Sequence, residues 1–386
     1  LIPLFKPAGL GQIEAVNLAY HLGKAISLCA IALLFLGNVR TYRFDSLEVS
    51  LVIFWAAYAI GCYQSGSSYE TVFNYSLTSL ALLMLFKIET SLGQVRVLMG
   101  ALWLLFAFLL LFQSASVFIV RQSVVLFPSQ YTYMYLFGED NYSAFMTLPM
   151  MAVVFYVDAA GLAGNERWKH RLTQAAYLVV LVSYLYVQSV AASVGFMTLG
   201  LFYLNRKKTE SLARRLSPVG IFAGFVGLLS LVLVFHIQDF AGQLVSSFLD
   251  KNIFTLNSRT VIWSQAGGLF AARPFFGWGD GLTESMIWGG HAHNFLLQLL
   301  TVSGVTGTAA FLYYLGRAYA NAGESIHSDS GAVLVGALVA MALLSFFDFY
   351  IGISAIFCFI ALVASVPKRL TTENELLEIK RAETND

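Results

Sequence analysis

Long apolar runs recur along almost the whole of this 386-residue chain. Each covers roughly 17 to 25 residues, which is enough for an α-helix to cross a hydrocarbon core about 30 Å thick. Strands of a membrane barrel would instead alternate apolar and polar residues over about ten positions, whereas these runs are apolar on all sides. The pattern therefore predicts an all-α polytopic membrane protein with about eleven spans. We place them at residues 13–37, 47–64, 71–88, 95–119, 143–161, 172–188, 190–205, 216–236, 294–316, 331–347 and 350–366.

The composition agrees, because 58% of the residues are hydrophobic and 12% are charged, whereas about a quarter of the residues of a soluble domain are charged. A net charge of +1 offers no basic field that would recruit nucleic acid. Cys29, Cys62 and Cys358 fall in or beside apolar runs without paired spacing. This argues against a disulfide framework and against a zinc site built on them.

Lysine and arginine collect in the connections on one side of the predicted spans, and such residues resist translocation. They are Arg40 and Arg43, Lys87 and Arg96, Arg167, Lys169 and Arg171, and Arg206, Lys207, Lys208, Arg214 and Arg215. That side is predicted to be cytoplasmic. The same alternation puts the N-terminus outside, and the chain opens without a Met or a signal peptide. We therefore expect a twelve-span parent protein with both termini inside.

This topology divides the chain into four parts. Residues 1–236 hold spans one to eight, with a first extracytoplasmic loop at about 120–142. Residues 237–293 form a large extracytoplasmic loop with surface helices, 294–366 hold the last three spans, and 367–386 form a cytoplasmic tail. Because long loops on a rigid scaffold concentrate function, the large loop is the predicted catalytic region.

That loop carries the most polar, glycine-rich stretch of the chain. Apolar residues at helical spacing (Val261, Trp263, Ala266, Leu269, Phe270) predict an amphipathic surface helix over 256–272, with Arg259 on its first turn. Pro274 ends it, and glycines allow a turn back toward the membrane. His293 then comes just before the ninth span. The positive end of a helix disfavours an imidazolium ion, so a neutral ring would be available there as a base.

At these residues the chain resembles the O-antigen ligase and polymerase superfamily of bacterial envelope enzymes. The family signature is a His followed by Asn, Ser or Gln, nine residues, and Gly-x-x-Gly, and here His293-Asn294 precedes Phe295 to Ser303 and Gly304-Val305-Thr306-Gly307. Arg259-x-x-x-Trp263 and Pro274-x-x-Gly277-x-Gly279 look like the family's upstream helix and turn. Gly138-Glu139-Asp140-Asn141 looks like its Gly-x-x-Asn entry to the fifth span.

One departure concerns a Ser-Arg pair that many relatives carry near the outer end of the sixth span. The aligned stretch here, residues 188–193, holds no cation. Arg121 is the substitute that we expect.

The resemblance implies a metal-independent glycosyltransferase, without a cofactor, in the bacterial cytoplasmic membrane and active on the extracytoplasmic side. Its donor would be a polyprenyl-diphosphate-linked glycan and its acceptor a sugar hydroxyl, on a lipid-linked repeat or on a lipid A core, with the bilayer and a chain-length regulator as further partners. His293 would be the base, because a neutral histidine can remove the acceptor proton. Arg259 would bind the diphosphate. The further substrate-binding candidates are Arg121, Arg273, His291, Asn294, Asn141 and Trp263.

Structural explanations compete with each assignment. His291-Ala292-His293 could hold a metal, although no third ligand is fixed by spacing, and Arg273, Trp263 and the glycines suit architectural roles. Within the family, a polymerase of surface polysaccharide (O-antigen, capsule or exopolysaccharide) is preferred slightly to an O-antigen ligase. A polysaccharide flippase is the alternative from another class. It should carry charged or interrupted spans at mid-membrane depth.

Overall fold

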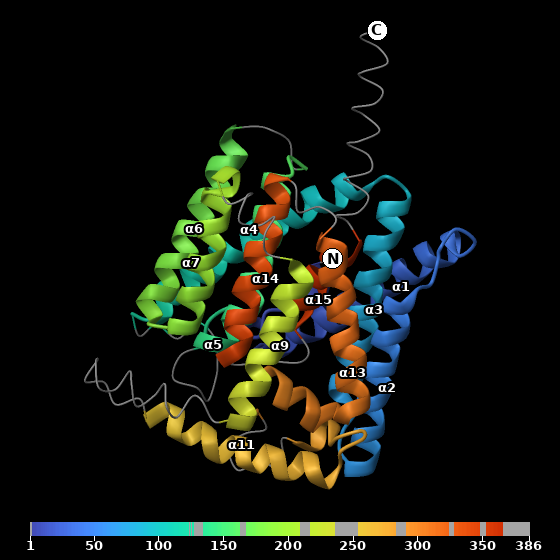
Figure 1. Ribbon diagram of the computed structural model, residues 1–386. Helices are drawn as coiled ribbons and strands as arrows, with labels where there is room; N and C mark the ends of the chain where they lie inside the picture. Colours follow the sequence, from blue (N-terminus) through green and yellow to red (C-terminus); the bar gives the residue numbers. More distant parts are fainter. Residues whose placement is uncertain are drawn as a thin grey trace.

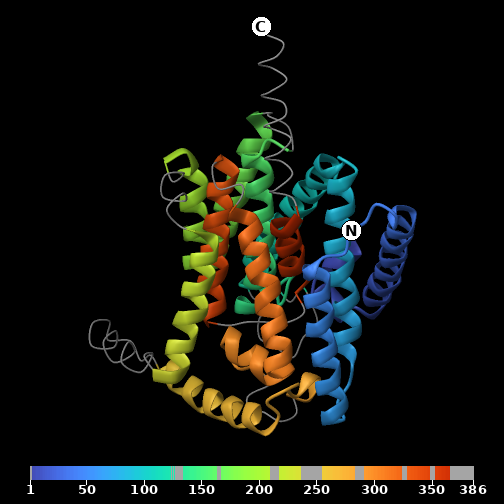
Figure 2. The same ribbon diagram turned by 45° about the vertical axis from the view of Figure 1, so that its right-hand side comes forward.

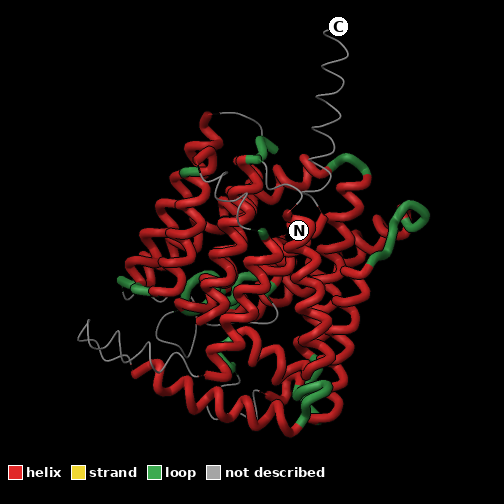
Figure 3. Tube along the Cα trace, in the orientation of Figure 1, coloured by secondary structure: helices red, strands yellow, loops and turns green. Residues whose placement is uncertain are grey.

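The computed structural model describes residues 2–122, 124, 126, 134–162, 167–208, 217–235, 254–282, 291–323, 328–347 and 353–365. Within these ranges the regular structure is helical, apart from one isolated bridge between Tyr135 and Gly138. Figure 3 shows helices joined by short loops. The prediction of an all-α fold is confirmed.

Each predicted span corresponds to one helix. The helices are α1 (Glu14–Asn38), α2 (Ser46–Ser65), α3 (Glu70–Ser91), α4 (Val95–Val120), α5 (Asp140–Ala159), α6 (Arg167–Val187), α7 (Val190–Leu204), α9 (Pro218–Phe235), α13 (Phe295–Gly323), α14 (Asp329–Phe347) and α15 (Ser354–Ser365). Six of them, α1 to α5 and α13, are long and apolar enough to cross a membrane. Three short 3-10 helices, η1 (Ile2–Phe5), η2 (Leu10–Gln12) and η3 (Gly279–Gly281), and α11 (Phe254–Ala272) complete the described elements. The chain is a multi-pass membrane protein.

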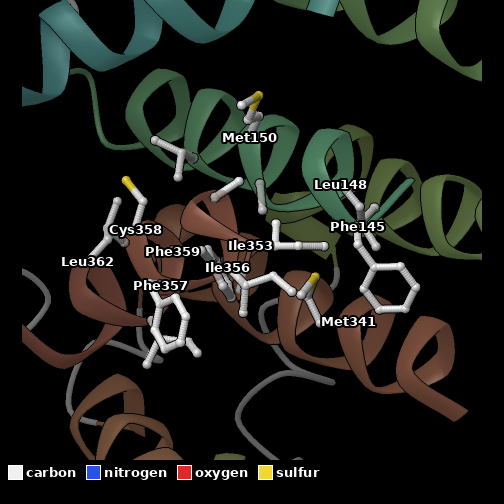
Figure 4. Close-up of a cluster of buried hydrophobic side chains, with 14 of the residues drawn as sticks. Phe145, Leu148, Met150, Met341, Ile353, Ile356, Phe357, Cys358, Phe359 and Leu362 are labelled. Atoms are coloured by element: carbon white, nitrogen blue, oxygen red, sulfur yellow. The ribbon is translucent and has the colours of Figure 1, made fainter. Parts of the chain in front are cut away.

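The bundle has a well-packed centre and a loose edge. In the most apolar stretch of α5, 83% of the residues are buried, against 6% in α1. Figure 4 shows why α5 is central: Phe145 and Leu148 lie in a buried cluster with side chains of α14 and α15, including Met341 and Phe359, while Met150 points to the other side of α5. In contrast, α1 leans away from the other helices in both ribbon views (Figures 1 and 2).

The two ends of the helix bundle carry different parts of the chain. Helix α11 lies across one end, as predicted for a surface helix (Figure 1). The connections that carry Arg40 and Arg43, Arg96, Arg167 and Lys207 lie toward the opposite end. The described part of the large loop is therefore gathered at the end away from the lysine and arginine clusters. Residues 237–253, 283–290 and the predicted tail at 367–386 lie outside the described residues.

Candidate functional site

Helix α13 is broken near its start, and the break organises the site. At Gly304 the backbone turns to φ 61° and ψ −169°. Before this point α13 runs beside α11, and after it α13 rises into the bundle (Figure 2). A break exposes helical N–H and C=O groups that need partners.

Those partners come from the turn at 274–279. The Val305 N–H donates to the Pro274 carbonyl at 2.8 Å, and the Thr306 N–H donates to the Phe275 carbonyl at 3.2 Å. On the other side of the break, the Trp278 N–H donates to the Thr301 carbonyl at 2.9 Å. The Pro-x-x-Gly-x-Gly and Gly-x-x-Gly motifs are therefore one structural unit.

Glycines make this unit possible because the backbones approach too closely for side chains. A Cβ on Gly304 would lie 2.2 Å from the Phe275 carbonyl carbon, and one on Gly277 would lie 2.5 Å from the Val302 carbonyl carbon. On Gly279 a Cβ would lie 2.3 Å from the Cys62 Sγ, and on Gly61 it would lie 2.7 Å from the Phe276 carbonyl oxygen. We call these four residues, Gly61, Gly277, Gly279 and Gly304, the glycine interlock. It joins α2, the turn and α13.

Asp280 extends the interlock to α3. Its carboxylate accepts a hydrogen bond from the Tyr58 hydroxyl at 3.0 Å and from the Thr71 N–H, in the first turn of α3, at 3.1 Å. Its own N–H donates to the Cys62 Sγ at 3.3 Å. A carboxylate at a helix N-terminus is favourable for α3. Asp280 therefore has an anchoring role that its position in the sequence did not reveal.

Residues 291–294, the histidine segment, are held by three side chains. The Trp263 Nε1–H of α11 donates to the Ala292 carbonyl at 2.7 Å, and the Ala292 N–H donates to the Gln298 Oε1 at 2.7 Å. The Asn294 Oδ1 accepts from the Leu297 N–H at 3.1 Å and so caps α13. Ala292 and Asn294 are fully buried. The segment is fixed on both sides of His293.

His293 itself has φ 47°, a left-handed conformation that residues other than glycine rarely adopt. Such strain costs on the order of 1–3 kcal/mol and persists only where the surroundings over-determine it. Its ring centroid lies 6.4 Å from that of His291, and both residues are half-buried. Among the described residues, no group of three or more His, Cys, Asp or Glu side chains could hold a metal ion. The structure thus brings His291, His293, Asn294 and Trp263 together.

The arginine candidates lie in three places. Arg259 belongs to α11, one helical turn before Trp263, but its side chain lies outside the described part of the structure. Arg273 follows α11, with its guanidinium carbon 3.9 Å from the Trp278 ring centroid. This stacking favours an architectural role. On α11 the residue buried next to Trp263 is Ile262, at 4% exposure, whereas Val261, expected on the apolar face, is 51% exposed.

Arg121 lies at the end of α4, next to the first loop. Its Nε–H donates to the Tyr135 hydroxyl at 2.8 Å, and Tyr135 packs in a buried cluster with Val187, the last residue of α6. Arg121 is therefore placed beside the end of α6, close to residues 188–193. Asn141 is the second residue of α5, and its side chain is outside the described part.

Gln298 is the residue that sequence reasoning missed. It is 5% exposed, and its side chain accepts the hydrogen bond of the Ala292 N–H. A lone glutamine in an apolar span, one turn after Asn294, was the available signal, because buried polar groups need partners.

Comparison with known families adds to this geometry. Residues 173–312 match a family model described as O-Antigen ligase. Searches of curated proteins and of solved structures gave no match. The matched range contains α11, the glycine interlock apart from Gly61, and the whole histidine segment. Residues 173–312 are thus similar to an O-antigen ligase domain, and this match supports the resemblance of the chain to the O-antigen ligase and polymerase superfamily.

Proposed function

We propose that this protein transfers a glycan from a polyprenyl-diphosphate carrier to a sugar hydroxyl on the extracytoplasmic side of the bacterial cytoplasmic membrane. The observation that supports it most is the histidine segment, in which hydrogen bonds made by Trp263, Gln298 and Asn294 fix the residues on both sides of His293, which has a left-handed conformation. Strained residues held in this way cluster at functional sites. A buried core histidine would need no such arrangement.

His293 acts as the general base. It takes the proton from the acceptor hydroxyl while that oxygen attacks the anomeric carbon of the donor. The bond between this carbon and the phosphate oxygen breaks, and polyprenyl diphosphate leaves. Positioned proton transfer of this kind contributes typically about 10²- to 10⁴-fold in rate. Its half-buried ring leaves access for an acceptor.

Arginine stabilises the diphosphate leaving group, whose charge grows as the bond breaks, without a metal ion. Arg259 takes this role because it lies on the helix that contacts the histidine segment through Trp263. Arg121, beside the end of α6, supplies the cation that residues 188–193 lack. Arg273 shapes the turn by stacking on Trp278.

The proposed orientation of the protein in the membrane is based on the positions of its lysine and arginine clusters. The connections that carry the lysine and arginine clusters lie toward the end opposite α11. Since such residues stay on the cytoplasmic side, the histidine segment faces outward, where a lipid-borne donor presents its glycan.

We favour polymerisation of repeat units, because residues 188–193 lack the Ser-Arg pair of many relatives. The alternative is ligation of a finished glycan to a lipid A core, which the description of the matching family model favours. The two differ in acceptor alone, so the same residues would serve either.

Reconstitution distinguishes these reactions. The purified protein in liposomes is given lipid-linked repeat units, with or without lipid A core, and the products are separated by size. A polymerase makes a ladder without the core, and a ligase makes a product only when the core is present. His293→Asn should slow the formation of either product about 10²- to 10⁴-fold. An unchanged rate of transfer after this change, or a glycan that crosses the bilayer with no new bond formed, would contradict the proposal.

A further inference from the structure

A second polar site lies far from the histidine segment in the sequence. A cavity of about 340 Å³ opens between the N-terminal residues, α1, α3 and the start of α5. Its charged lining residues are Lys6, Lys24 and Glu70, His21 is a further titratable residue, and its uncharged polar residues include Asn17, Asn74 and Tyr142. We call it the α1 cavity. None of its lining residues belongs to the glycine interlock or to the histidine segment.

The ammonium groups of two lysines face this cavity, and each has N–H donors beyond the one that a described residue accepts. The Lys6 Nζ donates to the Asn17 Oδ1 at 2.5 Å, and the Lys24 Nζ donates to the Asn74 carbonyl and lies 5.5 Å from the Tyr75 ring centroid. An ammonium has three N–H donors, and the described residues accept one from each lysine. Burial lowers the pKa of Lys6, and the charge of Glu70 raises that pKa in part. An anion in the cavity would stabilise both cations.

A second cleft lies further along the same helix. It has a volume of about 550 Å³ between α1, α3 and α4, and its lining is mainly apolar, including Ile31, Leu34 and Leu98, with Glu89 near the end of α3 and Gln94 just before α4. Five residues of α1 follow one another at spacings of four, three, four and three residues. Tyr20 and Lys24 line the cavity, and Ser27, Ile31 and Leu34 line the cleft. They therefore form one stripe of α1. From Lys24 to Leu34 the stripe is about 15 Å long, or half of a hydrocarbon core.

A polar head site and a mainly apolar cleft that follow one another along the same stripe of α1 suit an amphiphile. We propose that the α1 cavity and its cleft bind a membrane lipid with a single phosphodiester headgroup and an acyl tail, independently of the proposed glycosyl transfer. Lysine binds phosphate as a point charge. With His21 counted as neutral, Lys6 and Lys24 against Glu70 leave one net positive charge, which matches one phosphodiester, whereas a diphosphate would leave excess negative charge. A sugar acid would leave the apolar cleft empty.

The lipid would also border the candidate active site. Glu70 lines the α1 cavity, and the next residue, Thr71, donates its N–H to the Asp280 carboxylate that anchors the turn. The start of α3 therefore contacts both regions.

Lipid binding to the purified, delipidated protein tests the proposal by native mass spectrometry. Phosphatidylglycerol is titrated beside phosphatidylcholine with the same tails and beside glycerophosphate, which has no tail. Lys6→Gln and Lys24→Gln should each weaken phosphatidylglycerol binding about tenfold, because each removes a hydrogen bond from a charged donor. Lys207→Gln, an exposed lysine at the other end of the bundle, is the matched control and should change nothing.

Two further variants distinguish a specific loss of lipid binding from misfolding of the protein. Glu70→Gln should strengthen phosphatidylglycerol binding, since it removes the opposing carboxylate, and a damaged protein would not gain affinity. Ala30→Trp fills the apolar cleft and should weaken binding of the full lipid. Equal binding of phosphatidylglycerol by wild type and by the Lys6→Gln/Lys24→Gln protein would overturn the proposal. So would glycerophosphate binding as tightly as the lipid, or phosphatidylcholine binding as tightly as phosphatidylglycerol.

Discussion

Two residues other than glycine adopt a left-handed backbone in the described part of the chain, and their surroundings differ. Gln188, with φ 62°, lies between α6 and α7, and His293, with φ 47°, precedes α13. At Gln188 the reason is local. Its N–H donates to the Leu185 carbonyl at 3.1 Å, and the Ser189 N–H donates to the Tyr184 carbonyl at 3.2 Å. This is the Schellman pattern that ends many helices with a left-handed residue.

His293 has no preceding helix to end. Its conformation depends on residues from other parts of the chain: Trp263 of α11 and Gln298 of α13 bind the neighbouring Ala292, and Asn294 caps the helix that follows. The same backbone strain therefore serves to end a helix at Gln188 and to hold a side chain in place at His293.

Gly304→Ala should have the largest effect on stability. The new Cβ would lie 2.2 Å from the Phe275 carbonyl carbon at a residue with φ 61°, so the break in α13 must open. We expect a loss above about 4 kcal/mol, which is exceptional for one substitution, seen as loss of monodisperse protein. Gly227→Ala, at a helical glycine with open space around it, is the matched control. A stable Gly304→Ala protein would show that the interlock does not support the histidine segment.

Gln298→Met removes an acceptor and keeps the volume of the side chain. The fully buried Ala292 N–H then loses its partner, at a cost of about 1–3 kcal/mol. We expect a lower unfolding temperature and a slower transfer. If thermal unfolding and rate both match the wild type, the histidine segment is not held by this hydrogen bond.

Trp263→Phe removes the Nε1–H donor and keeps an aromatic ring. Losing one neutral hydrogen bond costs about 0.5–1.5 kcal/mol, so transfer should slow by roughly two- to tenfold. The same change at Trp168, an exposed residue at the opposite end of the bundle, should leave the rate unchanged. Equal rates for the two variants would contradict a role of Trp263 in positioning.

Gln188→Gly should have the smallest effect. Glycine adopts φ above zero without a steric cost, so stability should change by less than about 1 kcal/mol in either direction and transfer should continue. Thermal unfolding and the product ladder check this. A large loss of transfer would show that Gln188, like His293, takes part in the chemistry.

Much of the fold could be predicted because a membrane span is a local property: length and apolarity suffice. The bounds differ where helices continue beyond the apolar run. Helix α6 begins at Arg167, five residues before the predicted 172, because charged residues such as Lys169 and Arg171 form helix as readily as apolar ones. On α11 one member of the predicted apolar face was wrong: Val261 is exposed and Ile262 is buried, whereas Trp263 and Ala266 are buried as expected, because several helical faces fit a short apolar pattern.

The site was only partly predictable. The position of His293 before a helix follows from local sequence, and it is confirmed. Predicting the glycine interlock would have required knowing that Phe275 lies against Gly304. Predicting that Asp280 anchors the turn would have required knowing that its carboxylate reaches Thr71 in α3. Such contacts join distant parts of the chain and leave no local pattern. The roles of Arg259 and Arg121 stay predictions.

We propose that the backbone strain serves chemistry at His293 and not at Gln188. The most direct test is the initial rate of glycan transfer by His293→Asn and Gln188→Asn proteins, each reconstituted and normalised to folded protein. Asparagine tolerates the left-handed region better than most residues, so both backbones should persist, while only the first change removes a base. We predict a loss of about 10²- to 10⁴-fold for His293→Asn and an unchanged rate for Gln188→Asn. Equal rates for the two proteins would contradict the account.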